Sequence, residues 1–162
     1  MKSNSKKGVR VIWWILFICY LVGISYFLFF SERYGRTEGT SEYRYNLTLF
    51  KEINRFITYH RTIGLEGFFV NLVGNVVAFM PFGFGLPLIS SRDHKFFRIL
   101  FWSFGFSLSI ETIQLVYKIG IFDVDDLLLN TIGGILGYWC YCIVMLLIKH
   151  GGKKRVAKKR EY

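Results

Sequence analysis

The sequence predicts an all-α membrane protein, a bundle of four transmembrane helices with both termini in the cytoplasm. The chain contains four long apolar runs, and hydrophobic residues make up 52% of it although 20% are charged. Its basic clusters stand outside those runs. Because a helix rises about 1.5 Å per residue, about 20 apolar residues cross the hydrocarbon core. A chain of 162 residues has room for one such domain.

The apolar runs place the predicted helices at residues 11–30, 68–89, 96–117 and 127–148. The first run carries no charge and ends in Phe-Leu-Phe-Phe at 27–30, where a cleaved signal peptide would have small residues, so we expect a retained helix. Pro81 interrupts the second run and predicts a kink or a broken end there. The third run contains one carboxylate, Glu111.

Positive charge predicts the orientation of the bundle. Residues 1–10, 92–98 and 149–162 hold 14 Lys and Arg in total, against seven on the opposite side. The positive-inside rule then makes the two basic tails cytoplasmic and the loops 31–67 and 118–126 external. The tails would also attract anionic lipids, and we expect the C-terminal tail to be disordered. The net charge of +10 is thereby explained without nucleic acid as a partner.

The first external loop contains a helical pattern of apolar residues. Leu49, Ile53, Phe56 and Ile57 recur at spacings of three and four. Two interpretations stay open for this segment. It forms an amphipathic helix lying on the outer membrane surface, or an ordinary surface helix that covers the bundle.

Polar side chains recur on one face of the second and third helices. Asn71 and Asn75 are four residues apart, and Ser107, Glu111 and Gln114 follow each other at spacings of four and three. Amide and serine side chains often serve only as interhelical hydrogen bonds, worth about 0.6 kcal/mol. Glu111 is different, because a carboxylate within a membrane helix is costly and marks a functional candidate.

The fourth helix begins with a third polar group. Capping of the helix start accounts for one acid of the run at 123–126, Asp123 or Asp125, whereas Asp126 and Asn130 share a face of the helix. The motif Gly133-x-x-x-Gly137 continues along that side and permits close helix contact. With the predicted orientation, all three polar groups lie at one depth toward the external leaflet.

The sequence lacks the motifs of common catalytic and cofactor sites. It contains no P-loop, no GxSxG and no HExxH. The acids could hold a divalent cation through oxygen ligands, but the three histidines, at 60, 94 and 150, are not at a ligand spacing from them. The cysteines at 19, 140 and 142 fit apolar filler. We therefore predict no metal and no cofactor.

These motifs, in this order, resemble the VanZ family of small bacterial membrane proteins. The resemblance rests on Asn-Leu-Val-Gly-Asn at 71–75 with Phe79, Pro81 and Gly83; on Ser109-Ile110-Glu111 with Gln114; and on Asp-Val-Asp-Asp at 123–126 with Asn-Thr-Ile-Gly-Gly at 130–134 and Gly137. The segment at 46–50 is similar to the family's Asn-Leu-x-Pro-Phe, with Leu49 in place of Pro. Many members carry Arg shortly before the acidic run, where this chain has Gly120 and Ile121.

The resemblance implies a bacterial cell membrane protein and resistance to glycopeptide antibiotics, to teicoplanin more than to vancomycin. Three hypotheses follow, in order of preference. A non-enzymatic envelope protein would bind a lipid or lipid-linked ligand in an outer-leaflet pocket and limit the access of the drug to cell-wall precursors. An intramembrane enzyme would modify a lipid head group, with Glu111 as general acid or base and with Asp123 and Asp126 positioning the substrate. A transporter built from four helices would need a homo-oligomer.

Overall fold

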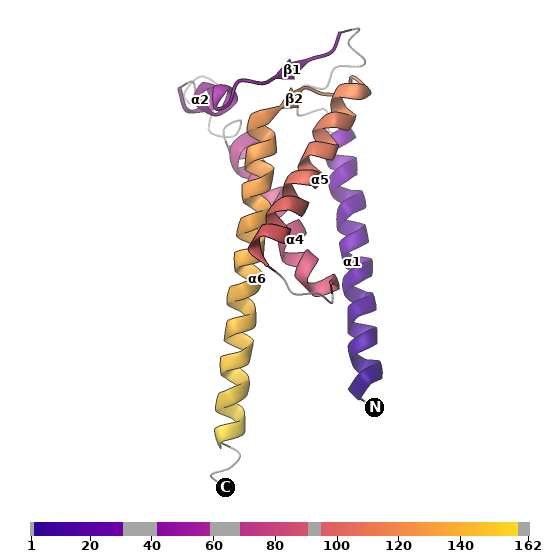
Figure 1. The fold of residues 1–162 in the computed structure, drawn as a ribbon, viewed down its shortest axis with the longest axis vertical. Helices are drawn as coiled ribbons and strands as arrows, with labels where there is room; N and C mark the ends of the chain where they lie inside the picture. The colour runs from indigo at the N-terminus through magenta and orange to yellow at the C-terminus, as the bar shows by residue number, and fades with distance from the viewer. Residues whose placement is uncertain (1, 31–41, 59–68, 91–94, 159–162) are drawn as a thin grey trace.

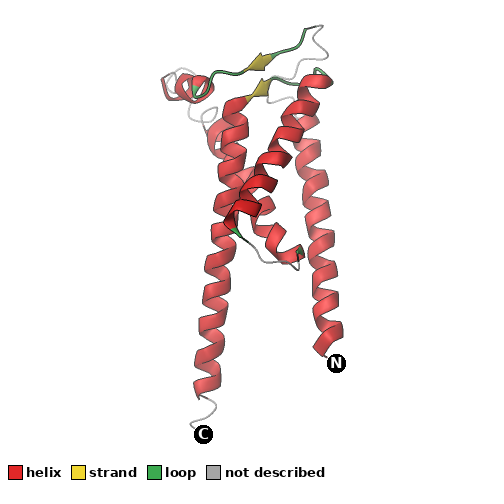
Figure 2. Cartoon of the chain, in the orientation of Figure 1, coloured by secondary structure: helices red, strands yellow, loops and turns green. Residues whose placement is uncertain are grey.

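The computed structural model describes residues 2–30, 42–58, 69–90 and 95–158, and helices dominate it (Figures 1 and 2). The elements are α1 (Lys2–Phe30), β1 (Tyr45–Asn46), α2 (Lys51–Thr58), the π-helical turn η2 (Phe69–Val73), α4 (Gly74–Ile89), α5 (Phe96–Val116), β2 (Phe122–Asp123) and α6 (Val124–Lys158). The two short strands lie with α2 at one end of the bundle, opposite the start of α1 and the end of α6 (Figure 1).

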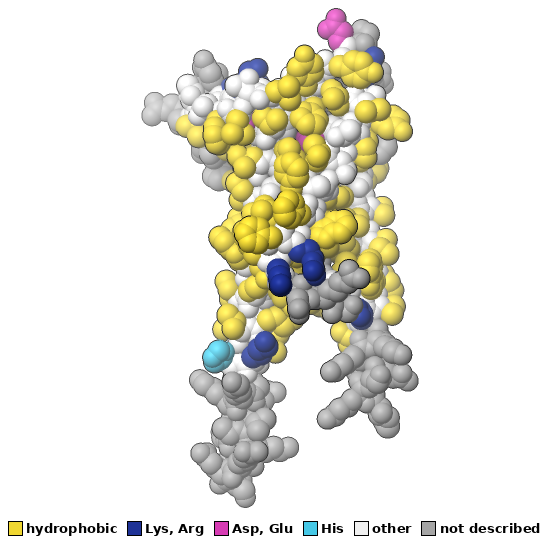
Figure 3. Space-filling view, in the orientation of Figure 1, with side chains coloured by type: hydrophobic (Ala, Val, Ile, Leu, Met, Phe, Trp, Pro, Cys, Tyr) yellow, Lys and Arg dark blue, Asp and Glu magenta, His cyan; other side chains and the backbone are white. Residues whose placement is uncertain are grey.

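Four helical segments of the described chain are long and apolar enough to cross a membrane. They are Gly8–Phe29, Asn71–Ile89, Phe96–Val116 and Val124–Gly151. Hydrophobic side chains cover much of their length on the face drawn in Figure 3, as a lipid-facing surface requires. The prediction of a four-helix membrane bundle is therefore confirmed.

The first and last helices are longer than predicted. α1 begins at Lys2, within the predicted tail, and α6 runs from Val124 to Lys158. The disorder predicted for the C-terminal tail is wrong over residues 149–158, while 159–162 lie outside the described residues. Because extending an existing helix avoids the cost of nucleation, and Lys, Arg and Ala favour helix, the tail continues α6.

Pro81 does not end the second membrane helix. α4 continues through both Pro81 and Pro87 to Ile89, and the irregular backbone lies instead at the start of the span, in the π-helical turn η2. Proline removes one intrahelical hydrogen bond, a loss that membrane helices tolerate when neighbouring helices hold the backbone in place. The predicted broken end at Pro81 is therefore wrong, and the kink, the other alternative, stays a prediction.

α4 and α6 form the most extensive helix pair of the bundle. Glycine allows this close approach: a Cβ atom built on Gly83 would lie 1.7 Å from the carbonyl oxygen of Gly134. A Cβ on Gly133 would lie 2.2 Å from the oxygen of Val76. The close contact expected from Gly133-x-x-x-Gly137 is thus present, and it holds the polar ends of α4 and α6 next to each other.

Hydrogen bonds join α1 to this helix pair and to α5. The Tyr20 hydroxyl donates to the carbonyl of Ala78 in α4 at 2.7 Å. Near the C-terminal end of α1, Gln114 Nε2 donates to the Leu28 carbonyl at 3.2 Å. Gln114 was a site candidate from sequence, and this bond gives it a structural role as well.

α5 ends in a Schellman motif that directs the chain across the end of the bundle. Lys118 has a φ of 56°, its N–H donates to the Leu115 carbonyl, and Ile119 N–H donates to Gln114 O. The chain then forms β2, which pairs in parallel with β1 through Tyr45↔Phe122 and Asn46↔Asp123. The all-α prediction did not include this strand pair, which joins the first loop to the start of α6.

The first loop contains the helix that its apolar spacing indicated. In α2, Phe56 is buried, Ile53 is half-buried and Ile57 is exposed, and Leu49, just before the helix, is exposed as well. α2 contacts α6 and lies at the bundle end where the strands are (Figure 1). Whether its exposed face also touches a membrane surface stays a prediction.

The orientation of the bundle is open to a direct test. We expect a cysteine at Thr48 to react with an impermeant maleimide added to intact cells, and a cysteine at Lys149 to react only after lysis, because the basic ends should be cytoplasmic. Both residues are exposed, and the native cysteines would first be replaced by alanine. Labelling of Lys149→Cys but not of Thr48→Cys would reverse the predicted orientation.

Candidate functional site

A cavity of about 690 Å³ lies at the bundle end that carries α2 and the strands. Seven of the eight residues singled out from sequence line it: Asn71, Asn75, Glu111, Gln114, Asp123, Asp126 and Asn130. The eighth, Ser107, is not among the lining residues but is bonded to one of them. Three separate stretches of the chain thus bring their polar side chains to one place.

Glu111 joins α5 to the segment before α6. The residue is only 3% exposed, and its Oε2 accepts a hydrogen bond from the backbone N–H of Asp123 at 3.0 Å. A carboxylate that accepts a backbone N–H positions the donor segment as well as itself. Glu111 therefore sets the place at which β2 crosses the cavity.

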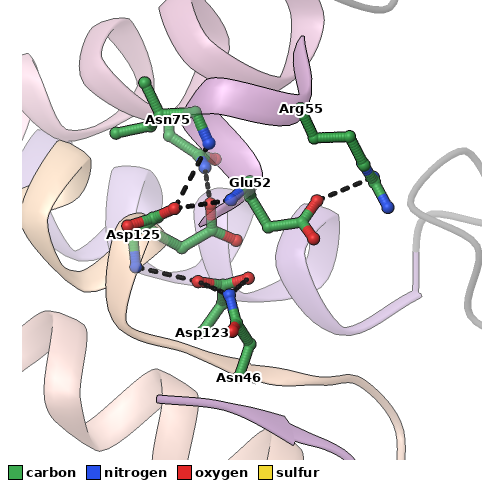
Figure 4. Close-up of polar contacts among 8 residues, drawn as sticks. Asn46, Glu52, Arg55, Asn75, Asp123 and Asp125 are labelled. Atoms are coloured by element: carbon green, nitrogen blue, oxygen red, sulfur yellow. Dashed lines mark hydrogen bonds and ion pairs between the residues drawn. The ribbon is translucent and has the colours of Figure 1, made fainter. Parts of the chain in front are cut away.

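Asp123 is held by the first loop and by its own turn (Figure 4). Asn46 Nδ2 lies 3.2 Å from each of its carboxylate oxygens, and the backbone N–H of Asp125 donates to Oδ1 at 2.8 Å. Burial raises the pKa of Asp123 above its usual value, while these hydrogen bonds and the positive charge of Lys51 act in the opposite direction. Asp123 thus takes up a proton more readily than a solvated aspartate.

Asp125 caps a helix other than its own. Its carboxylate is fully buried and accepts hydrogen bonds from three backbone N–H groups at the start of α2, those of Phe50, Glu52 and Ile53. These are the donors that a helix N-terminus leaves without an intrahelical partner. From sequence, capping is expected only for the fourth helix itself and Asp125 is not a site candidate, so the contact that holds α2 over the cavity is not predicted.

Asp126 and Asn130 connect α6 to its two neighbours. Asn75 Nδ2 donates to Asp126 Oδ1 at 2.6 Å, and this bond joins α4 to α6. Asn75 is labelled in Figure 4. Asn130 Nδ2 donates to Ser107 Oγ at 3.0 Å, which joins α6 to α5. Both helices next to α6 are thereby bonded to it at the base of the cavity.

One acceptor at the base of the cavity has no hydrogen-bond partner among the described residues. Asn130 is 2% exposed, and its Oδ1 accepts no bond from any residue that the structure describes. A buried acceptor of this kind is costly when it stays unsatisfied, and native structures contain few of them. The Asn130 carbonyl is therefore a position at which a donor from a bound molecule would be favourable.

The mouth of the cavity is basic. Arg44, Lys51 and Arg55 are exposed side chains of the first loop and line the cavity, as does Lys118 after α5. Arg55 is ion-paired with Glu52 at 2.7 Å, so its charge is partly balanced. The site therefore has cations at its solvent side and carboxylates and amides at its buried side.

The acids do not form a metal centre in the described part of the chain. No group of three or more His, Cys, Asp or Glu side chains within residues 2–30, 42–58, 69–90 and 95–158 is arranged to hold a metal ion. Instead, the carboxylates of Asp123 and Asp125 are surrounded by N–H donors. Their arrangement is that of acceptors which organise the loop.

The sequence predicts the residues at the base of the cavity but not those at its cover. Asn46 is noted only as part of the segment that resembles the family's Asn-Leu-x-Pro-Phe, and neither Asp125 nor Lys51 is predicted from sequence as a site residue. The signal that could have found Asn46 was that same segment, since it stands out in a loop that otherwise carries no site candidate. Lys51 is one of six basic residues of the loop and had no distinguishing mark.

The fold and the site define a class: a small multi-pass membrane protein whose spans carry a polar cavity at one end of the bundle. A model of the VanZ/LLP1 family matches residues 17–146, which include every cavity residue named above. The chain is also 33% identical to Protein VanZ of Enterococcus faecium over 119 residues, which are 68% of this chain and 71% of that protein. The chain belongs to the VanZ/LLP1 family. No solved structure matches it.

Proposed function

We propose that this protein acts in a bacterial cell membrane without catalysing a reaction and contributes to resistance against glycopeptides, teicoplanin more than vancomycin. In this proposal, the cavity binds the polar head of a lipid or lipid-linked molecule at the outer leaflet. Binding there limits the access of the drug to cell-wall precursors. The basic ends of the chain, which we place in the cytoplasm, contact anionic lipids of the inner leaflet.

The observation that carries the proposal is the cavity itself. Its volume of about 690 Å³ is in the range of ligand sites, and its lining comes from α4, α5, α6 and the first loop. Burying several carboxylates and amides at one level of a membrane bundle is costly, and ligand binding is a reason for that cost. Interhelical bonding alone accounts for Ser107 and Asn75 but not for a large polar space.

Replacing Glu111 by glutamine or Asp126 by asparagine should abolish protection while protein abundance stays normal. In each variant the amide keeps an oxygen that can accept the present hydrogen bond, from Asp123 N–H or from Asn75 Nδ2, but it loses the negative charge. We expect the inhibitory concentration of teicoplanin to fall to that of cells without the protein. The measurement is growth of a susceptible host that expresses each variant, on teicoplanin and on vancomycin.

Folded protein in the same cells must be quantified alongside growth. Glu42→Gln is the matched control, because Glu42 is an exposed acid of the first loop and does not line the cavity. We expect this variant to protect as the wild type does. If Glu111→Gln and Asp126→Asn also protect fully at equal abundance, the polar residues are interhelical bonding groups and the proposal is wrong.

An enzyme that modifies a lipid head group is the second candidate function. This candidate is supported by Asp123, because a raised pKa suits a general acid beside a cavity. Glu111 is its neighbour, since Glu111 Oε2 accepts a hydrogen bond from the backbone N–H of Asp123. Covalent change of a radiolabelled membrane lipid, dependent on Asp123 and Glu111, would favour this candidate. Unchanged lipids together with full protection would favour binding.

A further inference from the structure

The geometry points to a head group of one chemical class for the cavity: a phosphate ester that carries several hydroxyl groups, as in a polyol or sugar phosphate attached to a lipid. The inference rests on the proposed function and specifies its ligand. It follows from the different chemistry of the mouth and the base of one cavity.

The mouth of the cavity matches an anion. Lys51 and Arg44 are exposed side chains that line it, and both belong to the segment that α2 and β1 place over the base. Lysine and arginine are the usual partners of phosphate oxygens, and a charge at a solvated rim keeps most of its hydration while it attracts the ligand. A phosphate at this level would lie at the head-group depth expected for a membrane lipid.

The carboxylates at the base are already occupied by donors of the protein. Asp123 accepts bonds from Asn46 Nδ2 and from the Asp125 N–H, Glu111 Oε2 accepts the Asp123 N–H, and Asp126 Oδ1 accepts Asn75 Nδ2. These bonds use lone pairs that an ammonium group of a ligand would otherwise need. A cationic head group such as ethanolamine is therefore not the best match for the base.

The amides at the base match hydroxyl groups. Asn71, Asn75, Gln114 and Asn130 line the cavity, and an amide side chain can both donate and accept, as a hydroxyl does. Asn130 adds a specific site, because this residue lines the cavity and its buried Oδ1 has no partner among the described residues. A hydroxyl that donates to this oxygen would satisfy the acceptor and fix the orientation of the head group.

Two kinds of molecule share this chemistry. One is a glycerolipid with a polyol head, for which phosphatidylglycerol is the probe. The other is a prenyl phosphate that carries a sugar, for which synthetic farnesyl phosphoglucose is the probe, with farnesyl phosphate as its sugar-free counterpart. Phosphatidic acid, phosphatidylethanolamine and phosphatidylcholine serve as control glycerolipids, whose head groups contain a phosphate but no alcohol hydroxyl group.

Native mass spectrometry of the full-length protein in neutral detergent can count bound lipid for each probe. We expect one of two results. Either phosphatidylglycerol binds at least about fivefold more tightly than phosphatidic acid, phosphatidylethanolamine or phosphatidylcholine, or farnesyl phosphoglucose binds at least about fivefold more tightly than farnesyl phosphate. Whichever pair shows the selectivity identifies the source of the head group. Equal binding within both comparisons, or preference for phosphatidylethanolamine, overturns the inference.

Variants assign the selectivity to the cavity. Lys51→Gln should weaken binding of the selected probe about fivefold through the lost charge, whereas Lys95→Gln, at an exposed position that does not line the cavity, should not. Asn130→Leu should weaken binding of the hydroxyl-bearing probe about tenfold. Binding of the hydroxyl-free counterpart should stay within about twofold of its value for the wild type. Ser103→Ala, a buried polar change elsewhere on the helices, should leave both probes unaffected.

The thermal midpoint of each variant shows whether it folds, and Lys51→Gln tests the inference even if Asn130→Leu does not fold. If folded Asn130→Leu loses binding of both probes to the same extent, the Asn130 amide does not recognise hydroxyl groups, and the inference fails. The glycopeptide assay reports separately on the proposed function. If Glu111→Gln abolishes protection but no probe binds selectively, the cavity works with another ligand class. If Glu111→Gln protects fully, the proposed function itself is wrong.

Discussion

Alanine at Gly83 or at Gly137 should separate α4 from α6 and prevent stable folding of the bundle. A Cβ atom would lie 1.7 Å from the Gly134 oxygen in the first case and 1.9 Å from the Met80 oxygen in the second. Both obstructing atoms belong to helical backbone, so a rotamer change cannot relieve the clash. We expect each substitution to cost about 3 kcal/mol of unfolding free energy, the upper end of the usual cost of overpacking. The measurement is the thermal midpoint of purified protein in detergent, together with its abundance in membranes.

Gly105→Ala on α5 is the matched control, because a Cβ there meets nothing within 4 Å. Alanine favours helix over glycine by about 0.5–1 kcal/mol, so this variant should be as stable as the wild type or slightly more stable. Opposite effects of the same change at Gly83 and at Gly105 would establish close α4–α6 contact. Equal midpoints for both variants would show that the two helices are farther apart than this structure has them.

Alanine at Asp125 should release α2 from the cavity while the membrane helices stay folded. The substitution removes the acceptor of three backbone N–H groups at the start of α2 and leaves the helix attached through Phe56, its one buried side chain. Loss of a helix cap costs about 0.5–2 kcal/mol, and loss of charged acceptors costs more, so we expect the open form to be populated at least about tenfold more. Protection against teicoplanin should fall with it, because α2 supplies part of the cavity mouth.

The readout is the labelling rate of a cysteine at Ile53, a half-buried position on α2, in a background without native cysteines. The rate should rise at least about tenfold in Asp125→Ala and by less in Asp125→Asn, since the amide retains one acceptor oxygen. The thermal midpoint of the bundle should change little, because α4 and α6 pack without α2. An unchanged labelling rate would mean that other contacts hold α2, and a large fall of the midpoint would mean that Asp125 stabilises the whole bundle.

The membrane helices and the level of the polar residues could be predicted because both depend on local patterns. The length of an apolar run measures the hydrocarbon core, and spacings of three and four place Asn71 with Asn75 and Glu111 with Gln114 on one face. The errors arose where a local rule met a tertiary context. Pro81 breaks an isolated helix but is tolerated in α4, and the basic tail is helical because α6 precedes it.

The cover of the cavity could not be predicted, because the contacts that form it join residues far apart in the chain. Asp125 caps backbone groups 72 to 75 residues away, and Asn46 meets Asp123 across 77 residues. An acid at the start of a helix has a local explanation in capping its own helix, and no spacing rule distinguishes that use from capping a distant one. The strand pair is likewise too short to leave a period-two pattern.

The sequence by itself determined the class of the protein, the number of its membrane helices and the residues at the base of the cavity, since hydrophobic length and helical periodicity are properties of contiguous segments. Tertiary structure alone decided that Asp125 holds α2, that a two-stranded pairing joins the first loop to α6, and that Asn130 keeps a buried oxygen without a partner in the described chain. These features depend on which segments the close α4–α6 packing brings together. That packing is a property of three-dimensional fit, in which one added methyl group at Gly83 would lie 1.7 Å from the backbone oxygen of Gly134.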